Sequence, residues 1–478
     1  MSAMSRLSNI NVIMVGFALA MGASTFDIGL LTSIPLLAGL SQLLTHRILE
    51  SHRSRKRVCL RTLTGARLGK LLAVLLPWIP WVFVRDHRVW GLILIQAGVQ
   101  ALGSIGGISR ISWLSDLVSE SIRGRFFGNR NLVIDAVGMV ALMAGGRFID
   151  VWRDRHPDAE MGGFQIVIGL GVFFGMLSLL VMRITPEPPM RTGEKPIGFL
   201  RSLKVPLEHR AFRRFIAFQF LWSFAVGLAG PFFSVYMIKH LKIGFTWIGL
   251  YQNIGALASL YSVRFWGQWA DRFGNKPILT LCTAVKILFP LMWLFARPGH
   301  PLYLGFVYLL FAFNSGQKLA LFNIVLKLAP EENRAAYLSS RQAFMGLARA
   351  LSPILGGSLA ATLMTWKVEL PFLTIQGLPF LFFASGLMRF GAFLILRRLH
   401  EPGAQPVRSM VRVLRRIDGF VPTDGLGSFL YFWSAPVREL SQAVWNGGKR
   451  LRQAIGTGAN KPKNEHDGST EPEGSKGI

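Results

Sequence analysis

The residues of this sequence that could do chemistry are charged side chains inside long apolar segments. Lys318 lies about midway along the segment 302–328, and Asp135 lies about one turn into the segment 132–151. A charge deep in an apolar layer costs roughly 2.5 to 3.5 kcal/mol on membrane-insertion scales unless water or a partner compensates it. Side chains of these types could bind a solute or carry a coupling ion. They therefore mark a candidate cavity.

Each of these charges also has a structural explanation. Lys318 serves a cavity, or it snorkels or forms a structural ion pair. Asp135 titrates as a coupling residue, or it pairs with an arginine such as Arg349 or Arg130. Lys286 stands in the segment 277–296, and we expect it to snorkel to the membrane interface.

Other acids have local explanations. The sequence Ser24-x-x-Asp27 predicts a capping box at a helix start. Arg147 and Asp150 stand three residues apart, which is the spacing for an ion pair within one helix.

The sequence carries no enzymatic signature. It has no phosphate loop, no His-Glu-x-x-His and no Gly-x-Ser-x-Gly. Its two cysteines, Cys59 and Cys282, have no metal-ligand spacing. We therefore expect no enzyme, no cofactor and no metal site, and ATP-driven chemistry is disfavoured.

Composition indicates a polytopic membrane protein. The chain has 478 residues, of which 51% are hydrophobic and 16% charged, and its mean hydropathy is +0.40. This is more apolar than a soluble domain of similar size. The formal charge of +28 does not predict a nucleic-acid partner, because Lys and Arg fall in short loops and a tail. The lipid bilayer is the expected partner.

Twelve apolar segments are long enough to cross a bilayer, which takes about 20 residues each. In the first half they run near 6–22, 26–45, 63–84, 89–115, 132–151 and 164–182, and in the second near 214–238, 247–266, 277–296, 302–328, 342–364 and 374–397. Arg6, Asn9 and Asn11 interrupt the first span. Either that span lines a wet cavity or the true start lies upstream.

Loop charge predicts the orientation. The loops on the side of both termini hold 21 Lys and Arg residues, against 8 on the opposite side. Positively charged loops stay in the cytoplasm. We therefore expect a multi-pass protein of the cytoplasmic (inner) membrane with both termini cytoplasmic.

The two halves repeat. Glutamate, two arginines and an aromatic residue recur in register between Glu120–Asn131 and Glu331–Gln342. The repeat predicts two six-helix bundles in parallel orientation. The expected parts are a bundle over 1–182, a cytoplasmic loop over 183–213, a second bundle over 214–400, and a basic, partly disordered tail over 401–478. The tail either lies on the inner leaflet or only solubilises the chain.

A polar decapeptide separates the spans 247–266 and 277–296. We expect it to form a short cytoplasmic turn, in which Gly267 lets two helices approach and Gly274 allows the reversal. It resembles the loop signature of the major facilitator superfamily, Gly-x-x-x-Asp-Arg-x-Gly-Arg-Arg/Lys. The matching residues are Gly267, Asp271, Arg272, Gly274 and Lys276. The counterpart in the first half is degenerate and keeps an acid, Glu50, among basic residues.

The resemblance covers about residues 1–400 and implies an all-α membrane protein of twelve transmembrane helices. In this family the first, fourth, seventh and tenth helices line a central cavity. The polar residues that our spans place on the last three are Gln96, Gln100, Ser104, Gln219, Trp222, Asn314 and Lys318. Asp135 is the candidate coupling residue.

The expected function is secondary active transport of a small organic solute by alternating access, coupled to an ion gradient. Lys318 favours a neutral or anionic solute. Two pairs, Asp271 with Arg341 and Glu50 with Arg130, are expected to latch the cytoplasmic side shut. We expect a monomer. The alternative is a transport-fold protein that serves as an assembly or lipid-handling factor.

Overall fold

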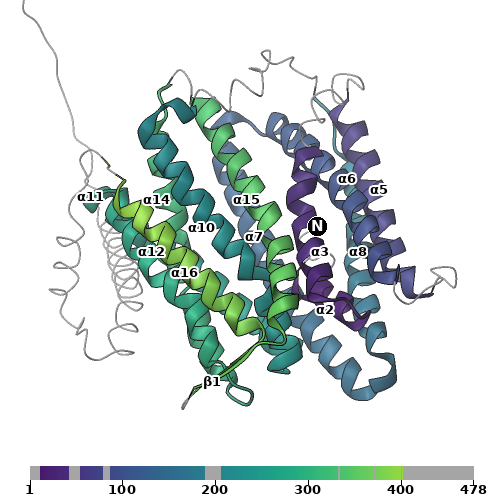
Figure 1. Cartoon of the computed structure of the whole chain (residues 1–478). Helices are drawn as coiled ribbons and strands as arrows, with labels where there is room; N and C mark the ends of the chain where they lie inside the picture. Colours follow the sequence, from purple (N-terminus) through teal and green to yellow (C-terminus); the bar gives the residue numbers. More distant parts are fainter. Residues whose placement is uncertain are drawn as a thin grey trace, which may run out of the picture. The chain divides into compact units, whose positions relative to one another are not determined.

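The described chain is almost entirely helical (Figure 1). The computed structural model describes residues 11–41, 54–78, 87–188, 206–331, 334–370, 373–399 and 401. The helices of the first half are α2 (Val12–Ala20), α3 (Thr25–Leu37), α5 (Arg55–Leu75), α6 (Arg88–Leu117), α7 (Glu120–Arg155) and α8 (Glu160–Ile184). Those of the second half are α10 (Arg210–Val235), α11 (Phe245–Phe273), α12 (Asn275–Met292), α13 (Pro301–Leu309), α14 (Ala312–Leu328), α15 (Arg334–Leu363) and α16 (Leu378–Arg397).

Shorter elements join these helices. The 3-10 segments are Ala38–Ser41, Leu76–Trp78, Pro157–Ala159 and Trp293–Phe295, and a π turn, Tyr236–His240, ends α10. An antiparallel hairpin of β1 (Lys367–Leu370) and β2 (Leu373–Gln376) joins α15 to α16, with Lys367 opposite Gln376.

Each of the twelve predicted spans overlaps described helix, although the tenth is divided between α13 and α14 and the twelfth begins in β2. Eight helical segments of the described chain are long and apolar enough to cross a bilayer by length and composition. They are Arg88–Leu117, Glu120–Arg155, Pro157–Ile184, Arg210–His240, Asn275–Phe295, Pro301–Leu328, Ala336–Leu363 and Leu378–Arg397. The helices α2, α3, α5 and α11, which match the other predicted spans, fall outside this set. The described parts of α2 and α3 are short, and α5 carries several basic residues.

The predicted turn between the eighth and ninth spans is shorter than expected. Helix α11 continues through Phe273, so most of the decapeptide is helical and the reversal falls on Gly274, whose φ is +91°. The Gly274 amide still donates to the Ala270 carbonyl, which extends the helical bonding beyond the apolar stretch. A Cβ at Gly267 would meet nothing within 4 Å, so the close helix approach expected there is wrong.

The predicted capping box at the start of α3 is confirmed. The Asp27 amide donates to Ser24 Oγ at 3.2 Å, and the Ser24 amide donates to Asp27 Oδ2 at 2.9 Å. This acid is therefore occupied at a helix N-terminus.

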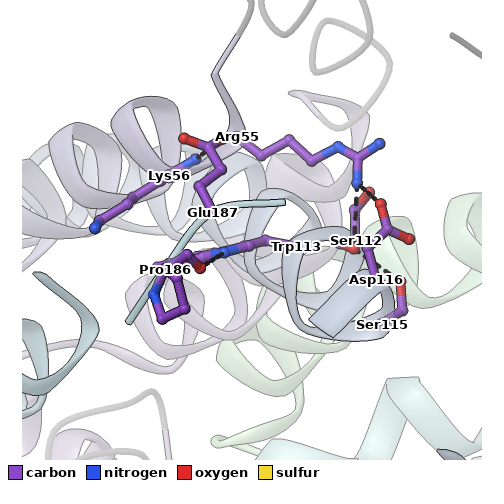
Figure 2. A network of polar contacts seen from close by, with 8 residues as sticks. All are labelled: Arg55, Lys56, Ser112, Trp113, Ser115, Asp116, Pro186 and Glu187. Carbon is purple, nitrogen blue, oxygen red and sulfur yellow. Dashed lines mark hydrogen bonds and ion pairs between the residues drawn. The ribbon is translucent and has the colours of Figure 1, made fainter. Parts of the chain in front are cut away.

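A carboxylate holds the start of α5 in the first half (Figure 2). Glu187, which follows α8, accepts hydrogen bonds from the Ser54 hydroxyl at 2.8 Å and from the Lys56 amide at 2.9 Å. Arg55 forms an ion pair with Asp116 near the end of α6. These bonds join α5, α6 and the segment after α8 at one end of the first half.

The second half repeats this arrangement. Glu401, which follows α16, accepts from the Lys276 amide at 2.6 Å, from Asn275 at 3.2 Å and from Lys327 at 2.7 Å. It thus holds the start of α12, which runs beside α16 in Figure 1. A Glu-Pro pair follows the last helix of both halves in the sequence. The repeat between the halves therefore extends to the carboxylate that caps the third helix of each.

The two halves are in close contact at one end, which we name the closed end. There α3 packs on α15, and a Cβ at Gly29 would lie 2.2 Å from the Pro353 carbonyl oxygen. Helix α7 packs on α11, where a Cβ at Gly146 would lie 2.7 Å from the Phe245 carbonyl oxygen. At the opposite end of α7, most residues from 120 to 137 are exposed.

Asp150 forms the polar part of the closed end. Its carboxylate accepts from the Phe245 and Thr246 amides, both at 2.8 Å, and from the Thr246 hydroxyl at 2.6 Å. It therefore caps the N-terminus of α11 from the other half. The expected pair with Arg147 is wrong, and Arg153 lies 3.9 Å from this carboxylate instead. Asp150 and the start of α11 are far apart in the sequence, so local residue spacing could not predict this contact.

We expect Asp150→Asn to open the closed end more often, because it removes the negative charge at the α11 N-terminus. A loss of about 1 to 2 kcal/mol would shift the open population roughly five- to thirtyfold. The measurement is the alkylation rate of Phe26→Cys at this end. Both native cysteines are buried. The control is Asp154→Asn, because Asp154 is exposed on the same helix. Equal rates in both variants would contradict the role of Asp150.

We expect Glu401→Gln to lower the free energy of unfolding by about 2 kcal/mol, and with it the midpoint of thermal unfolding. Burial raises the pKa of Glu401, but bonds from Lys327, the Lys276 amide and Asn275 outweigh it and leave the pKa below its ordinary value. The contribution is thus complete above the ordinary pKa and is lost as pH falls through the lowered one. The difference between wild type and variant should shrink in acid. The control, Glu331→Gln, alters an exposed pair and should change little at any pH.

Candidate functional site

A cavity of about 950 Å³ lies mainly within the second half. Its walls come from α10, α11, α12, α13, α14 and α16, and from the chain between α13 and α14. Helix α7 of the first half contributes Asp135 and Met139. The cavity is therefore faced by both halves, and it is the site that the geometry offers for a solute.

Four charged side chains line the cavity. Lys286, Lys318 and Arg389 come from the second half, and Asp135 comes from the first. Lys318 and Asp135 are exposed although they face the cavity, so water reaches this space. Within the part of the chain that the structure describes, none of the three cations forms an ion pair with a carboxylate. The cavity wall is therefore positively charged.

Lys286 does not snorkel. Its Nζ donates to Gln317 Oε1 at 2.5 Å and lies 5.5 Å from the centre of the Trp222 ring. Gln317 is held in turn by a bond of 3.3 Å from its amide nitrogen to Thr283 Oγ1. The expectation failed because the rotation of α12 turns this side chain inward, toward α10 and α14.

Arg389 shares the same aromatic ring. Its guanidinium carbon lies 5.7 Å from the centre of the Trp222 ring, and its Nη1 donates to the Lys286 carbonyl oxygen at 3.0 Å. Cation–π contacts of this kind contribute about 0.5 to 2 kcal/mol each. Sequence reasoning missed Arg389, although an arginine inside the apolar span 374–397 was a signal that could have revealed it.

A break in the tenth predicted span positions the residues on α14. Helix α13 ends at Leu309 and α14 begins at Ala312. Bonds of the i to i+3 type replace the regular pattern, including Phe311 N to Tyr308 O at 3.0 Å and Asn314 N to Phe311 O at 2.9 Å. Such tight turns inside a helix often mark functional positions. Here the break brings Phe311, Asn314 and Lys318 to the cavity.

The candidates from the sequence divide into two groups. Asn314, Lys318 and Asp135 line the cavity. The lining does not include the other five, which are Gln96, Gln100, Ser104, Gln219 and Trp222.

The structure gives each of these five another environment. Gln96 is fully buried, with its amide nitrogen 3.7 Å from Met14 Sδ. Gln219 accepts a hydrogen bond from Arg341 Nε at 2.7 Å. Trp222 is buried behind the two cations, while Gln100 and Ser104 are half-buried on α6.

The structure describes some of the residues that were expected to latch the cytoplasmic side shut. Asp271 is exposed in the last turn of α11, and no ion pair joins it to Arg341 in the described chain. Arg272 lies over the Phe273 ring at 5.4 Å. Arg130 donates to Asn131, and Glu50 lies outside the described residues. The described residues contain no group of His, Cys, Asp and Glu that could hold a metal ion.

Comparisons with known proteins agree on the fold. The sequence model of the Major Facilitator Superfamily matches residues 1–321 and 224–444. The structure of the nucleoside transporter NupG is similar over 84% of this chain and 98% of its own, with a TM-score of 0.60 and 13% identity.

Two further structures are similar. A bacterial homologue of the iron transporter ferroportin in an inward-facing state matches over 83% of this chain and 95% of its own, with a TM-score of 0.62 and 14% identity. A D-xylose-proton symporter matches over 85% and 96%, with a TM-score of 0.59 and 13% identity. At these identities the likeness shows the fold alone. No curated protein matches the chain.

Proposed function

The chain belongs to the major facilitator superfamily, and from this premise we propose that it is a secondary active transporter that moves a small organic solute by alternating access. The observation that carries this proposal is the water-accessible cavity of about 950 Å³ faced by both halves. A solute in that space touches Asp135 of one half and Lys318 of the other. Movement of the halves would then expose it to either side in turn.

We propose that both termini are cytoplasmic, in the inner membrane of a bacterium. The excess of Lys and Arg in the loops on their side supports this orientation. In it, the closed end faces outward and the cavity opens to the cytoplasm. The moving bodies would be the bundles of residues 1–182 and 214–400.

The charges support a neutral or anionic solute. Three cations and one carboxylate line the cavity, and an uncompensated cation attracts an anion more strongly there than in water. The same field repels lipophilic cations. Asp135 and Lys318 are the candidates for coupling to an ion gradient, because both are titratable and reach water.

We expect Lys318→Gln to weaken the binding of an anionic solute at least tenfold. The affinity for a neutral solute of equal size should stay within about twofold. The measurement is uptake and binding by protein in sealed vesicles across anionic, neutral and cationic solutes. Arg264→Gln is the control, because Arg264 is an exposed cation of α11 outside the cavity lining. Tight binding of a lipophilic cation would contradict the proposal that the solute is neutral or anionic. Binding without accumulation would favour the assembly or lipid-handling role.

We expect Asp271→Asn and Arg341→Gln to favour the state that is open to the cytoplasm. Arg341 bonds Gln219 in the present state, and the proposed latch to Asp271 forms only when the cytoplasmic side closes. A latch of about 1 to 2 kcal/mol shifts the population five- to thirtyfold. The measurement is thiol accessibility at Phe126→Cys, an exposed position on α7. The double variant should add nothing to either single change, and additive effects would mean that the two residues act separately.

A further inference from the structure

The second half holds a pair of cations on one indole ring, beside the cavity and apart from the α14 residues considered so far. We propose that Arg389 and Lys286, positioned by the Trp222 ring, form a subsite for the charged end of an organic anion whose body is apolar. The inference rests on the proposed transport function and names its substrate class.

Arg389 supplies the permanent charge of this subsite. Its side chain lies on α16 and is only 3% exposed, yet it lines the cavity. A guanidinium stays protonated in proteins, so burial cannot neutralise it. One nitrogen donates to the Lys286 carbonyl, while Nε has no hydrogen-bond partner within the described chain. A buried donor left in this way has the capacity for an acceptor that is absent from the protein.

Lys286 supplies a second charge in a fixed position. Gln317 accepts from its ammonium, and Trp222 lies under both cations. The ammonium has three donors, and only one of them is used by a described acceptor. The two cations are thus aligned by an uncharged amide and a ring, which orient them without neutralising them.

No carboxylate of the second half balances these charges. The described helices from α10 to α16 contain one acid, Asp271, and it lies in the last turn of α11. The cavity lining contains one carboxylate, Asp135, against three cations. Two like charges held together in an apolar bundle are costly unless a counter-charge is near. A bound anion would provide that counter-charge.

The wall beside the subsite is aromatic. Phe289 lies three residues after Lys286 on α12, and its ring is 5.2 Å from that of Phe311 and 5.3 Å from that of Phe233. All three line the cavity. A ligand with its charge at Arg389 would therefore place an apolar body against rings, where edge or offset stacking is favourable.

The test is equilibrium dialysis of the purified full-length protein with three radiolabelled probes. These are 1-naphthoate, the uncharged 1-naphthamide, and 1-naphthyl phosphate, which separates carboxylate from phosphate recognition. Sulfate serves as a competing anion that lacks an apolar body. The variants are Arg389→Met, Lys286→Met and Arg389→Lys, with Arg264→Gln as the control. Empty micelles correct for partitioning of the probes.

We expect wild type to bind at least one naphthyl anion ten times more tightly than the amide. Arg389→Met and Lys286→Met should each weaken that anion about ten- to a hundredfold and leave the amide within twofold. Arg389→Lys should keep part of the affinity. Removal of a buried unpaired charge can itself stabilise a protein, so each variant is compared with and without the anion. The anion should raise the thermal midpoint of wild type and should not raise that of Arg389→Met.

Anion and amide binding with equal affinity would overturn the subsite. So would an anion affinity that falls with Lys318→Gln but not with Arg389→Met or Lys286→Met, although anion transport through the cavity would then stand. Solute uptake into vesicles reports on transport separately. Sulfate that competes as well as the naphthyl anions would contradict the apolar body.

Discussion

A permanent positive charge inside an apolar helix bundle is the constraint on which this structure depends. Moving such an ion out of water costs several kcal/mol even after the protein relaxes. Around Arg389 the compensation comes from a carbonyl on α12 and a ring on α10. Both are available only if α10, α12 and α16 pack closely. Ser385, one turn before Arg389, helps to hold α16 against α10 by donating to the Ala225 carbonyl at 2.6 Å.

The cavity follows from a second constraint, the satisfaction of backbone groups inside the membrane. Between α13 and α14 the regular helical bonds are lost, and i to i+3 bonds replace them. The break turns Phe311 toward α11, where a Cβ at Gly255 would lie 2.6 Å from its ring. A small residue opposite an aromatic one thus accommodates the irregular turn. The polar side chains after the break then face water rather than lipid.

Much of the fold could be predicted from the sequence, because apolar length and local caps are properties of single segments. The twelve spans and the Asp27 capping box are of this kind. The partners of Lys286 and Asp150 could not be predicted, since they lie on other helices and depend on how each helix is rotated. For Gln96, a polar residue in a span indicated a cavity, yet the side chain is buried against Met14. Polarity identified residues that need partners, but not the partners.

Helix α7 links the closed end to the charge balance of the cavity. Asp150 holds it against α11, and Asp135 lies fifteen residues earlier on the same helix, or about 22 Å away at 1.5 Å per residue. A tilt of α7 by about 10° around the contact at Asp150 would move Asp135 by roughly 4 Å. The cations on α12, α14 and α16 belong to the other half and would not follow. If the halves rock as proposed, the motion would change how much of the positive wall Asp135 compensates, and with it the strength with which the cavity attracts an anion.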